Sequence, residues 1–213
     1  MYFNTTPSKW TLILLLLLTG CKAIPFITKA PYDFDKDQRK TILREGQETP
    51  MRVFKINNYE DSILLRTASE KVLFGRDQKV LHTFVNRLYA TVRDSLSMGV
   101  GIAAPQVGVL KNIIWVQRFD KDNLPFEVYI NPKIIRYSEQ KQDCREGCLS
   151  IPGRSDTTKT RSYSITIEYD QLNAVHKTEE VEGFTAVIFQ HEIDHLNGIL
   201  YLDHLEKEVA ESK

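Results

Sequence analysis

The sequence of 213 residues predicts an α+β fold. Two stretches have the apolar spacing of helices, and several short strand-like segments lie between them. The helices and strands do not alternate regularly, as they would in a doubly wound sheet, so we expect sheets packed against a few helices. The content of 42% apolar and 26% charged residues is typical of a globular domain.

The first expected helix runs from Asp77 to Met98. Its apolar residues recur at steps of three and four, which is the spacing of one helix face. His82 lies on this helix, and we expect it at the surface. The apolar residues are Val80, Leu81, Phe84, Val85, Leu88, Tyr89, Val92 and Leu96.

Five strands are expected after this helix, in segments rich in β-branched and aromatic residues. Turn residues such as Asn131-Pro132 and Pro152-Gly153 separate them. The expected strands are Asn112–Gln117, Phe126–Ile130, Lys133–Tyr137, Ser164–Tyr169 and Ala174–Thr178.

A second helix is expected from Phe184 to about Asn197, because Gly183 and Gly198 flank an apolar helical pattern. A third, short helix is expected near Asp203. No internal repeat is visible in the sequence.

The N-terminus is predicted to be a signal peptide. An apolar run from Thr11 to Leu18 is too short to span a bilayer. The sequence Leu18-Thr19-Gly20-Cys21 resembles the lipobox of bacterial lipoproteins, in which cleavage exposes a cysteine that carries lipid. We therefore expect a signal peptide over residues 1–20, a lipid anchor on Cys21 and a protein held on a membrane outside the cytosol. The alternative is an uncleaved hydrophobic N-terminus on a cytoplasmic protein.

The domain is expected over residues 51–205, with a tail over residues 206–213. Residues 22–50 are charged and lack periodicity, so we expect a tether there. The 28 basic residues balance the 28 acidic ones, and no net field favours nucleic acid as a partner.

The strongest motif is the HExxH segment His191-Glu192-Ile193-Asp194-His195. Residues four apart share one helix face, so both imidazoles can reach one cation, and Glu192 is a candidate general base. A chance occurrence on a surface helix is the alternative. The apolar residues 186–189 before the motif favour a position at the edge of a core.

A catalytic metal site needs a third protein ligand. Metallopeptidases with an HExxHxxGxxH motif take the last histidine as third ligand, and this chain has Tyr201 there. His204 lies three positions too late for that role, so we expect it at the surface. The candidate is Cys148, because a thiolate and two imidazoles leave a fourth position for water. Taken alone, Cys148 would more often be a small buried residue.

Three motifs together resemble the peptide deformylases. They occur in the family's order, and the likeness runs from about Met51 to Asp203. It implies antiparallel or mixed β-sheets packed around a central HExxH helix, with a long helix before them. The motifs are Gly99-Val100-Gly101-Ile102-Ala103-Ala104-Pro105-Gln106, Glu146-Gly147-Cys148-Leu149-Ser150 and Gln190-His191-Glu192-Ile193-Asp194-His195-Leu196.

The resemblance implies a hydrolase that removes the formyl group from N-formylmethionyl peptides and releases formate. It implies one divalent metal on Cys148, His191 and His195: ferrous iron in the family, with zinc or nickel also able to occupy the site. Hydroxide on that metal attacks the formyl carbonyl, while Glu192 acts as general acid and base.

The resemblance also implies where substrate binds. The Gln106 side chain and the Leu149 backbone N–H are the implied donors to the oxyanion. The peptide is expected as an added strand along residues 99–101 (Gly99, Val100 and Gly101) and Gly147, since glycines allow close approach. A phosphate-binding loop is the alternative, but no Lys-Ser/Thr follows. The candidates for a methionine pocket are Val100, Ile102, Ile188 and Phe189.

Further expectations concern the surroundings of the metal. Asp194 and Glu146 are expected to orient a ligand or a loop. Cys144 lies four residues before Cys148 and could pair with it under oxidising conditions. The C-terminal end is short and mixed in charge, which makes docking on the ribosome doubtful. Two rival functions are a zinc endopeptidase and a non-catalytic lipoprotein that binds formyl peptides.

Overall fold

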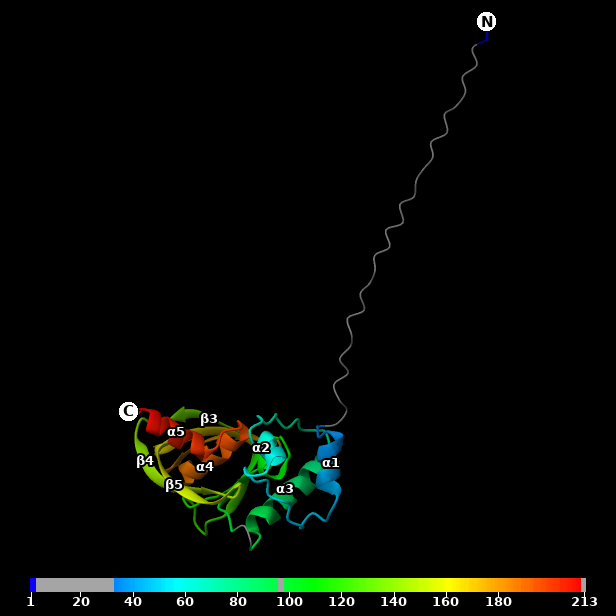
Figure 1. Ribbon diagram of the computed structural model, residues 1–213. Coiled ribbons are helices and arrows are strands. Elements are labelled where there is room, and N and C mark those ends of the chain that lie inside the picture. Colours follow the sequence, from blue (N-terminus) through cyan, green and yellow to red (C-terminus); the bar gives the residue numbers. More distant parts are fainter. Residues whose placement is uncertain (3–32, 96–97, 212–213) are drawn as a thin grey trace. The chain divides into compact units, whose positions relative to one another are not determined.

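Two antiparallel sheets and a central helix make up the core of the fold (Figure 1). The computed structural model describes residues 1–2, 33–95 and 98–211, and residues 31–213 form one compact unit. The strands are β1 Gly101–Ala103, β2 Ile113–Gln117, β3 Phe126–Tyr137, β4 Lys141–Cys148, β5 Ile151–Ser162, β6 Ser164–Asp170 and β7 His176–Glu182. The helices are α1 Lys36–Leu43, α2 Tyr59–Leu65, α3 Gln78–Arg93, the 3₁₀ helix η1 Ala104–Val107, α4 Gly183–Leu196 and α5 Tyr201–Glu211.

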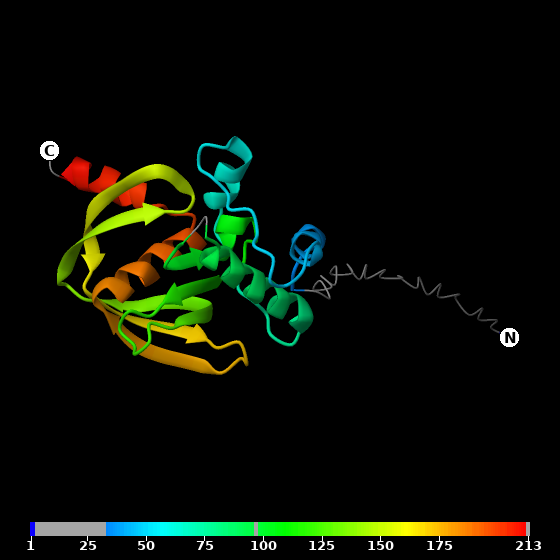
Figure 2. The ribbon, with the colours of Figure 1, turned by 90° about the horizontal axis from the view of Figure 1, so that it is seen from below.

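The larger sheet has the order β1-β2-β3-β6-β7, and β4 pairs with β5 in a separate hairpin. Along β6 every second residue is buried, which is the pattern of a strand with one face on a core. Figure 2 shows α4, in orange, between the five-stranded sheet and the yellow-green β4–β5 hairpin. The expected α+β fold with sheets around the HExxH helix is therefore confirmed.

Helix α4 is buried from Thr185 to Leu196 except at Asp194, while Phe184 at its start is exposed. It packs against β1, β2, β3 and β7 of the larger sheet and also contacts both strands of the hairpin. The helix is therefore covered by sheets on two sides. This burial places the HExxH motif inside the domain rather than on a surface helix.

Helix α3 forms where the apolar spacing predicts it, but the expected continuation to Met98 was wrong, because the helix ends at Arg93 and the backbone of Asp94 is already non-helical. Its buried face includes Leu81, Phe84 and Leu88, and His82 is exposed as expected. Tyr89 is 40% exposed, and its ring packs at a tilt against that of Trp115, with ring centroids 4.8 Å apart, instead of entering the core.

The hairpin of β4 and β5 was not predicted. Its two strands form a separate sheet and carry mostly polar residues, so they show no alternation of apolar and polar residues. The two strands expected over residues 126–130 and 133–137 form one bulged strand, β3, with Asn131 at φ 52°. The strand expected at Ala174–Thr178 lies later in the chain, as β7, and residue 174 is part of the preceding turn.

The tether expected over residues 22–50 is wrong from Asp33 onward. Helix α1 starts at a capping box between Asp35 and Gln38, and its Ile42 is fully buried against α3. Arg87 of α3 donates to the carbonyl oxygens of Thr41 and Ile42. The segment is too short for helical periodicity to be visible, but the capping box was a signal for it.

The tail expected over residues 206–213 is helical to Glu211, as part of α5. The predicted signal peptide, Cys21 and residues 22–32 lie outside the described residues, apart from residues 1–2. In the described part of the chain, no helix is both long enough and apolar enough to cross a membrane.

Candidate metal centre

Three potential metal ligands converge between β4 and α4. Cys148 is the last residue of β4, and His191 and His195 lie one turn apart on α4. One ligand atom from each lies within 4.8 Å of the other two, and the Cys148 Sγ is 3.2 Å from His195 Nε2. The structure therefore brings together the three residues that the sequence selected as ligands.

The donor set fits a divalent cation. A thiolate with two imidazoles suits zinc and other transition metals. Burial alone would raise the pKa of the Cys148 thiol. The neighbouring His195 and His191 lower this pKa by more than burial raises it, so the net pKa is well below its usual value. His191 Nδ1 lies 2.8 Å from Glu146 Oε2, so this nitrogen carries the proton and Nε2 is left for a cation.

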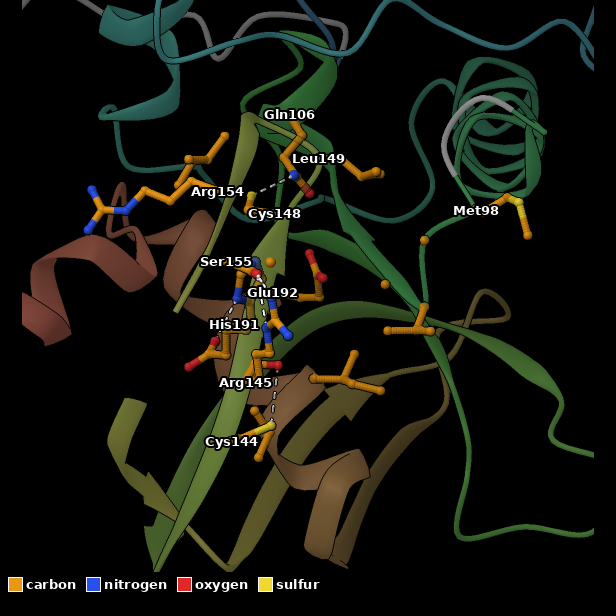
Figure 3. A pocket seen from close by; sticks show the side chains of 18 of the residues that line it. Met98, Gln106, Cys144, Arg145, Cys148, Leu149, Arg154, Ser155, His191 and Glu192 are labelled. Carbon is orange, nitrogen blue, oxygen red and sulfur yellow. Dashed lines mark hydrogen bonds and ion pairs between the residues drawn. The ribbon is translucent and has the colours of Figure 1, made fainter. Parts of the chain in front are cut away.

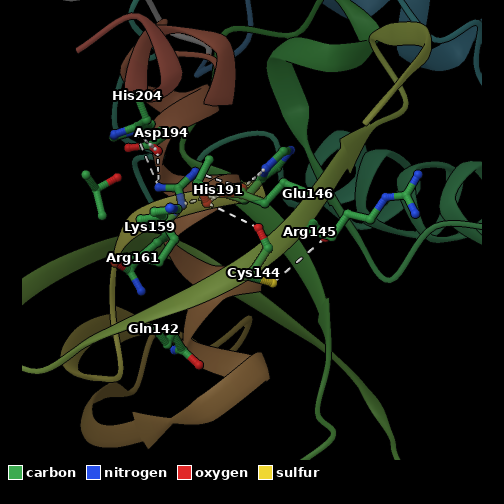
Figure 4. Close-up of polar contacts among 12 residues, drawn as sticks. Gln142, Cys144, Arg145, Glu146, Lys159, Arg161, His191, Asp194 and His204 are labelled. Atoms are coloured by element: carbon green, nitrogen blue, oxygen red, sulfur yellow. Dashed lines mark hydrogen bonds and ion pairs between the residues drawn. The ribbon is translucent and has the colours of Figure 1, made fainter. Parts of the chain in front are cut away.

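Glu146 belongs to a buried ion network behind His191, which we call the Arg161 network (Figure 4). Arg161 Nε and Nη2 donate to the two Glu146 oxygens over 2.8 and 2.9 Å, and its Nη1 donates to Asp194 over 2.6 Å. His204 Nε2 lies 2.8 Å from Asp194. Asp194 thus contacts no ligand directly, and His204 is only a quarter exposed because it closes the network.

Gln106 faces the thiolate from η1. Its Oε1 accepts from the Ala103 N–H over 2.9 Å, which turns the amide nitrogen towards the site. That nitrogen lies 3.6 Å from Cys148 Sγ (Figure 3). It also lies 3.2 Å from the Ser150 hydroxyl. The side-chain amide is thus held with its donor directed at the candidate metal centre.

Glu192 is 4% exposed and lies in the same site. Burial raises its pKa to about 7, although His191 and His195 oppose this. Its Oε2 has no hydrogen-bond partner among the described residues, so it is available for another group. A Cβ on Gly101 would lie 2.4 Å from Glu192 Oε1, so Gly101 makes room for this carboxylate rather than only for a substrate.

A cavity of about 620 Å³ opens in front of these groups (Figure 3). Gly99, Val100, Gly101, Gly147 and Leu149 line it, as do Cys148, His191 and Glu192. Ile188 also lines the cavity, but Ile102 and Phe189 are fully buried in the core. Those two residues were therefore wrong as candidates for a side-chain pocket.

Other groups near the site are not ligands. The Tyr201 ring stacks at 6.1 Å from His191, but its hydroxyl donates to the Arg154 carbonyl. Cys144 and Cys148 are both free thiols. The Cys144 sulfur contacts the Arg145 carbonyl oxygen instead.

Sequence reasoning did not find Arg161 or Ser150. Arg161 lies in a polar strand with no motif around it, and its role depends on the pairing of β5 with β4. The position of Ser150 inside the Cys148 motif was a signal that could have found it.

Comparison with known proteins agrees with this geometry. The family described as polypeptide deformylase matches residues 53–211. The peptide deformylase of Desulforudis audaxviator (strain MP104C) is 40% identical over 155 residues, which cover 72% of this chain and 94% of that protein.

Two solved structures have the same fold. The class I type b peptide deformylase of Acinetobacter baumannii with bound Met-Ala-Ser has a TM-score of 0.65 at 30% identity, covering 74% of this chain and 99% of that one. The peptide deformylase of Synechococcus elongatus in complex with actinonin has a TM-score of 0.62 at 33% identity, covering 73% and 78%. From its sequence, its fold and the residues gathered around Cys148, this chain belongs to the polypeptide deformylase family of enzymes.

Proposed function

We propose that this protein hydrolyses the formyl amide of N-formylmethionyl peptides and releases formate. The observation that carries the proposal is the convergence of Cys148, His191 and His195 with Glu192 and Gln106 in one cavity. The bond that breaks joins the formyl carbon to the amino nitrogen. The oxygen of water ends on formate, and its proton ends on the freed amine.

The metal is proposed to be held by Cys148, His191 and His195. When bound, a divalent cation there supplies a Lewis acid that lowers the pKa of water and polarises a carbonyl. We propose ferrous iron from the family resemblance, with zinc or nickel as alternatives. Metal analysis of the protein purified without oxygen decides among the three.

The protein's own groups move the proton and stabilise charge. Glu192 accepts a proton from water and passes it to the leaving amine, which suits a carboxyl whose pKa burial raises to about 7. The Gln106 amide, already directed at the site, and the Leu149 N–H donate to the oxyanion of the tetrahedral intermediate.

The peptide is proposed to add as a strand at the Gly99–Gly101 edge, opposite Gly147. Val100, Leu149 and Ile188 supply apolar surface for the methionine side chain. Crowding at the metal by Glu192 and Gln106 favours formyl over larger acyl groups.

The test uses formyl-Met-Ala-Ser and an unformylated peptide with internal bonds. Formate release without internal cleavage supports the proposal, and internal cleavage instead indicates an endopeptidase. Glu192→Gln should lower turnover at least about 100-fold with the metal still bound. The matched control is Glu182→Gln, an exposed glutamate just before α4, which should keep full turnover. A chelator should abolish formate release, and added metal should restore it.

We also propose that the protein is a lipoprotein anchored through Cys21 on a membrane outside the cytosol. The sequence Leu18-Thr19-Gly20-Cys21 after an apolar run supports it. Labelled palmitate should enter the wild type but not Cys21→Ala. Unlabelled cytoplasmic protein with its N-terminus intact would refute the anchor and leave the hydrolase proposal standing.

A further inference from the structure

A lysine outside the three motifs contacts the turn that follows Cys148. Lys55 is half-buried in the segment before α2, and its Nζ donates to the carbonyl oxygen of Leu149 over 2.5 Å. The Ser150 N–H lies 3.4 Å from Cys148 Sγ. Both contacts involve one peptide unit, because the Leu149 carbonyl and the Ser150 N–H share it.

The geometry of that peptide links the two charges. In a planar trans peptide the oxygen and the N–H point in opposite directions. The ammonium of Lys55 therefore lies at the negative end of the peptide dipole and the Cys148 sulfur at its positive end. A cation on the carbonyl polarises the peptide and makes its N–H a stronger donor.

We infer that Lys55 is a positioning residue that stabilises negative charge on the Cys148 sulfur through the Leu149–Ser150 peptide. This inference rests on the proposed metal site. It assigns Lys55 to tuning of the thiolate, with no direct contact to substrate.

Neighbouring contacts hold Lys55 in this place. Its backbone N–H donates to Asp61 over 2.9 Å, and Asp61 is buried in a two-bond pair with Arg52. The N–H of Phe54 donates to the Gln106 carbonyl, and that of Ile56 donates to the Ser150 carbonyl. The segment thus ties together the two loops that present the proposed oxyanion donors, with Lys55 as its charged member.

The test reads the sulfur directly with cobalt(II) in the site. Without the ammonium the Ser150 N–H is a weaker donor, so the thiolate donates more charge to the metal. We expect the thiolate-to-cobalt absorption band of Lys55→Met to move to longer wavelength and that of Lys55→Arg to return towards the wild type. Turnover of Lys55→Met should fall about 10–100-fold with a smaller change in KM. The control is Lys121→Met. It removes a partly exposed, ion-paired lysine in the turn between β2 and β3 and should leave the band unchanged.

A wild-type band in folded, cobalt-loaded Lys55→Met would overturn the inference. If Lys55→Met does not fold, Lys55→Gln decides, because glutamine keeps a donor to the Leu149 carbonyl without the charge. A shifted band in Lys55→Gln supports the inference, and an unshifted one overturns it. The band is independent of the reaction, so a protein that shows the shift but releases no formate would refute only the proposed function.

Discussion

Two of the buried arginines in the described part of the chain, Arg161 and Arg118, are each surrounded by several carboxylates. In the Arg161 network, Arg161 binds Glu146 and Asp194, and Glu146 continues to His191. Arg118, after β2, donates to Asp120, Glu127, Glu179 and the Tyr129 hydroxyl, which we call the Arg118 network. Both guanidiniums are at most 3% exposed. The two networks differ in where they end: the Arg161 network reaches His191, whereas the named partners of Arg118 lie on β3, on β7 and in the turn after β2.

Among the tests of this comparison, the largest expected effect is that of Arg161→Met. It leaves Glu146 buried without its cation, so the free energy of unfolding should fall by about 3–5 kcal/mol. His191 loses its fixed orientation, and turnover should fall about 10–100-fold. Urea unfolding and formate release per bound metal measure the two. Full turnover in folded, metal-loaded Arg161→Met would show that the Arg161 network does not support the reaction, in contrast to the expectation above.

Arg118→Met should lower the free energy of unfolding but leave turnover unchanged. Its carboxylate partners Asp120, Glu127 and Glu179 remain 26%, 34% and 24% exposed, so water can replace part of the lost contacts. We expect the free energy of unfolding to fall by about 1–3 kcal/mol. Turnover per folded molecule should match the wild type. A large loss of turnover at a temperature where the variant is folded would show that the Arg118 network also supports the site.

His204→Asn probes the outer edge of the Arg161 network. It removes the contacts of His204 to Asp194 and to Arg161 Nη1 but leaves the Arg161, Glu146 and His191 side chains in place. The free energy of unfolding should fall by about 1 kcal/mol, and turnover should fall less than about 10-fold. The same assays measure both. A loss as large as that of Arg161→Met would place His204 within the functional part of the network.

The smallest expected effect is on the stability of the protein at acidic pH. Hydrogen bonds from Arg118 lower the pKa of Asp120 to about 2, from an ordinary value of 3.8. A lowered pKa in the folded state gives stability that is present above pH 4 and is lost as the pH falls towards 2. The difference in urea midpoint between metal-free wild type and Arg118→Met should therefore shrink from pH 5 to pH 3. A constant difference would show that Asp120 does not carry this part of the stability.

The fold was predictable where the pattern along the chain is strong. The spacing in α3 and the apolar run before His191 mark the helices, and β6 alternates clearly. The β4–β5 hairpin was not predictable, because an exposed two-stranded sheet has no apolar alternation to reveal it. Helix α1 was missed because eight residues are too few for a periodic signal.

The sequence by itself determined the family and the residues with metal-binding chemistry. Cys148, His191, Glu192 and His195 stand in motifs whose side chains carry the chemistry, and helix geometry alone sets the two histidines on one face. Tertiary structure decided which groups control them. Arg161 and Lys55 lie 13 and 93 residues away from Cys148 in the sequence. Only the folded chain brings Arg161 to Glu146, which contacts His191, and Lys55 to the Leu149 carbonyl. The physical reason is that hydrogen bonds and ion pairs depend on distance in space, which local sequence patterns do not encode.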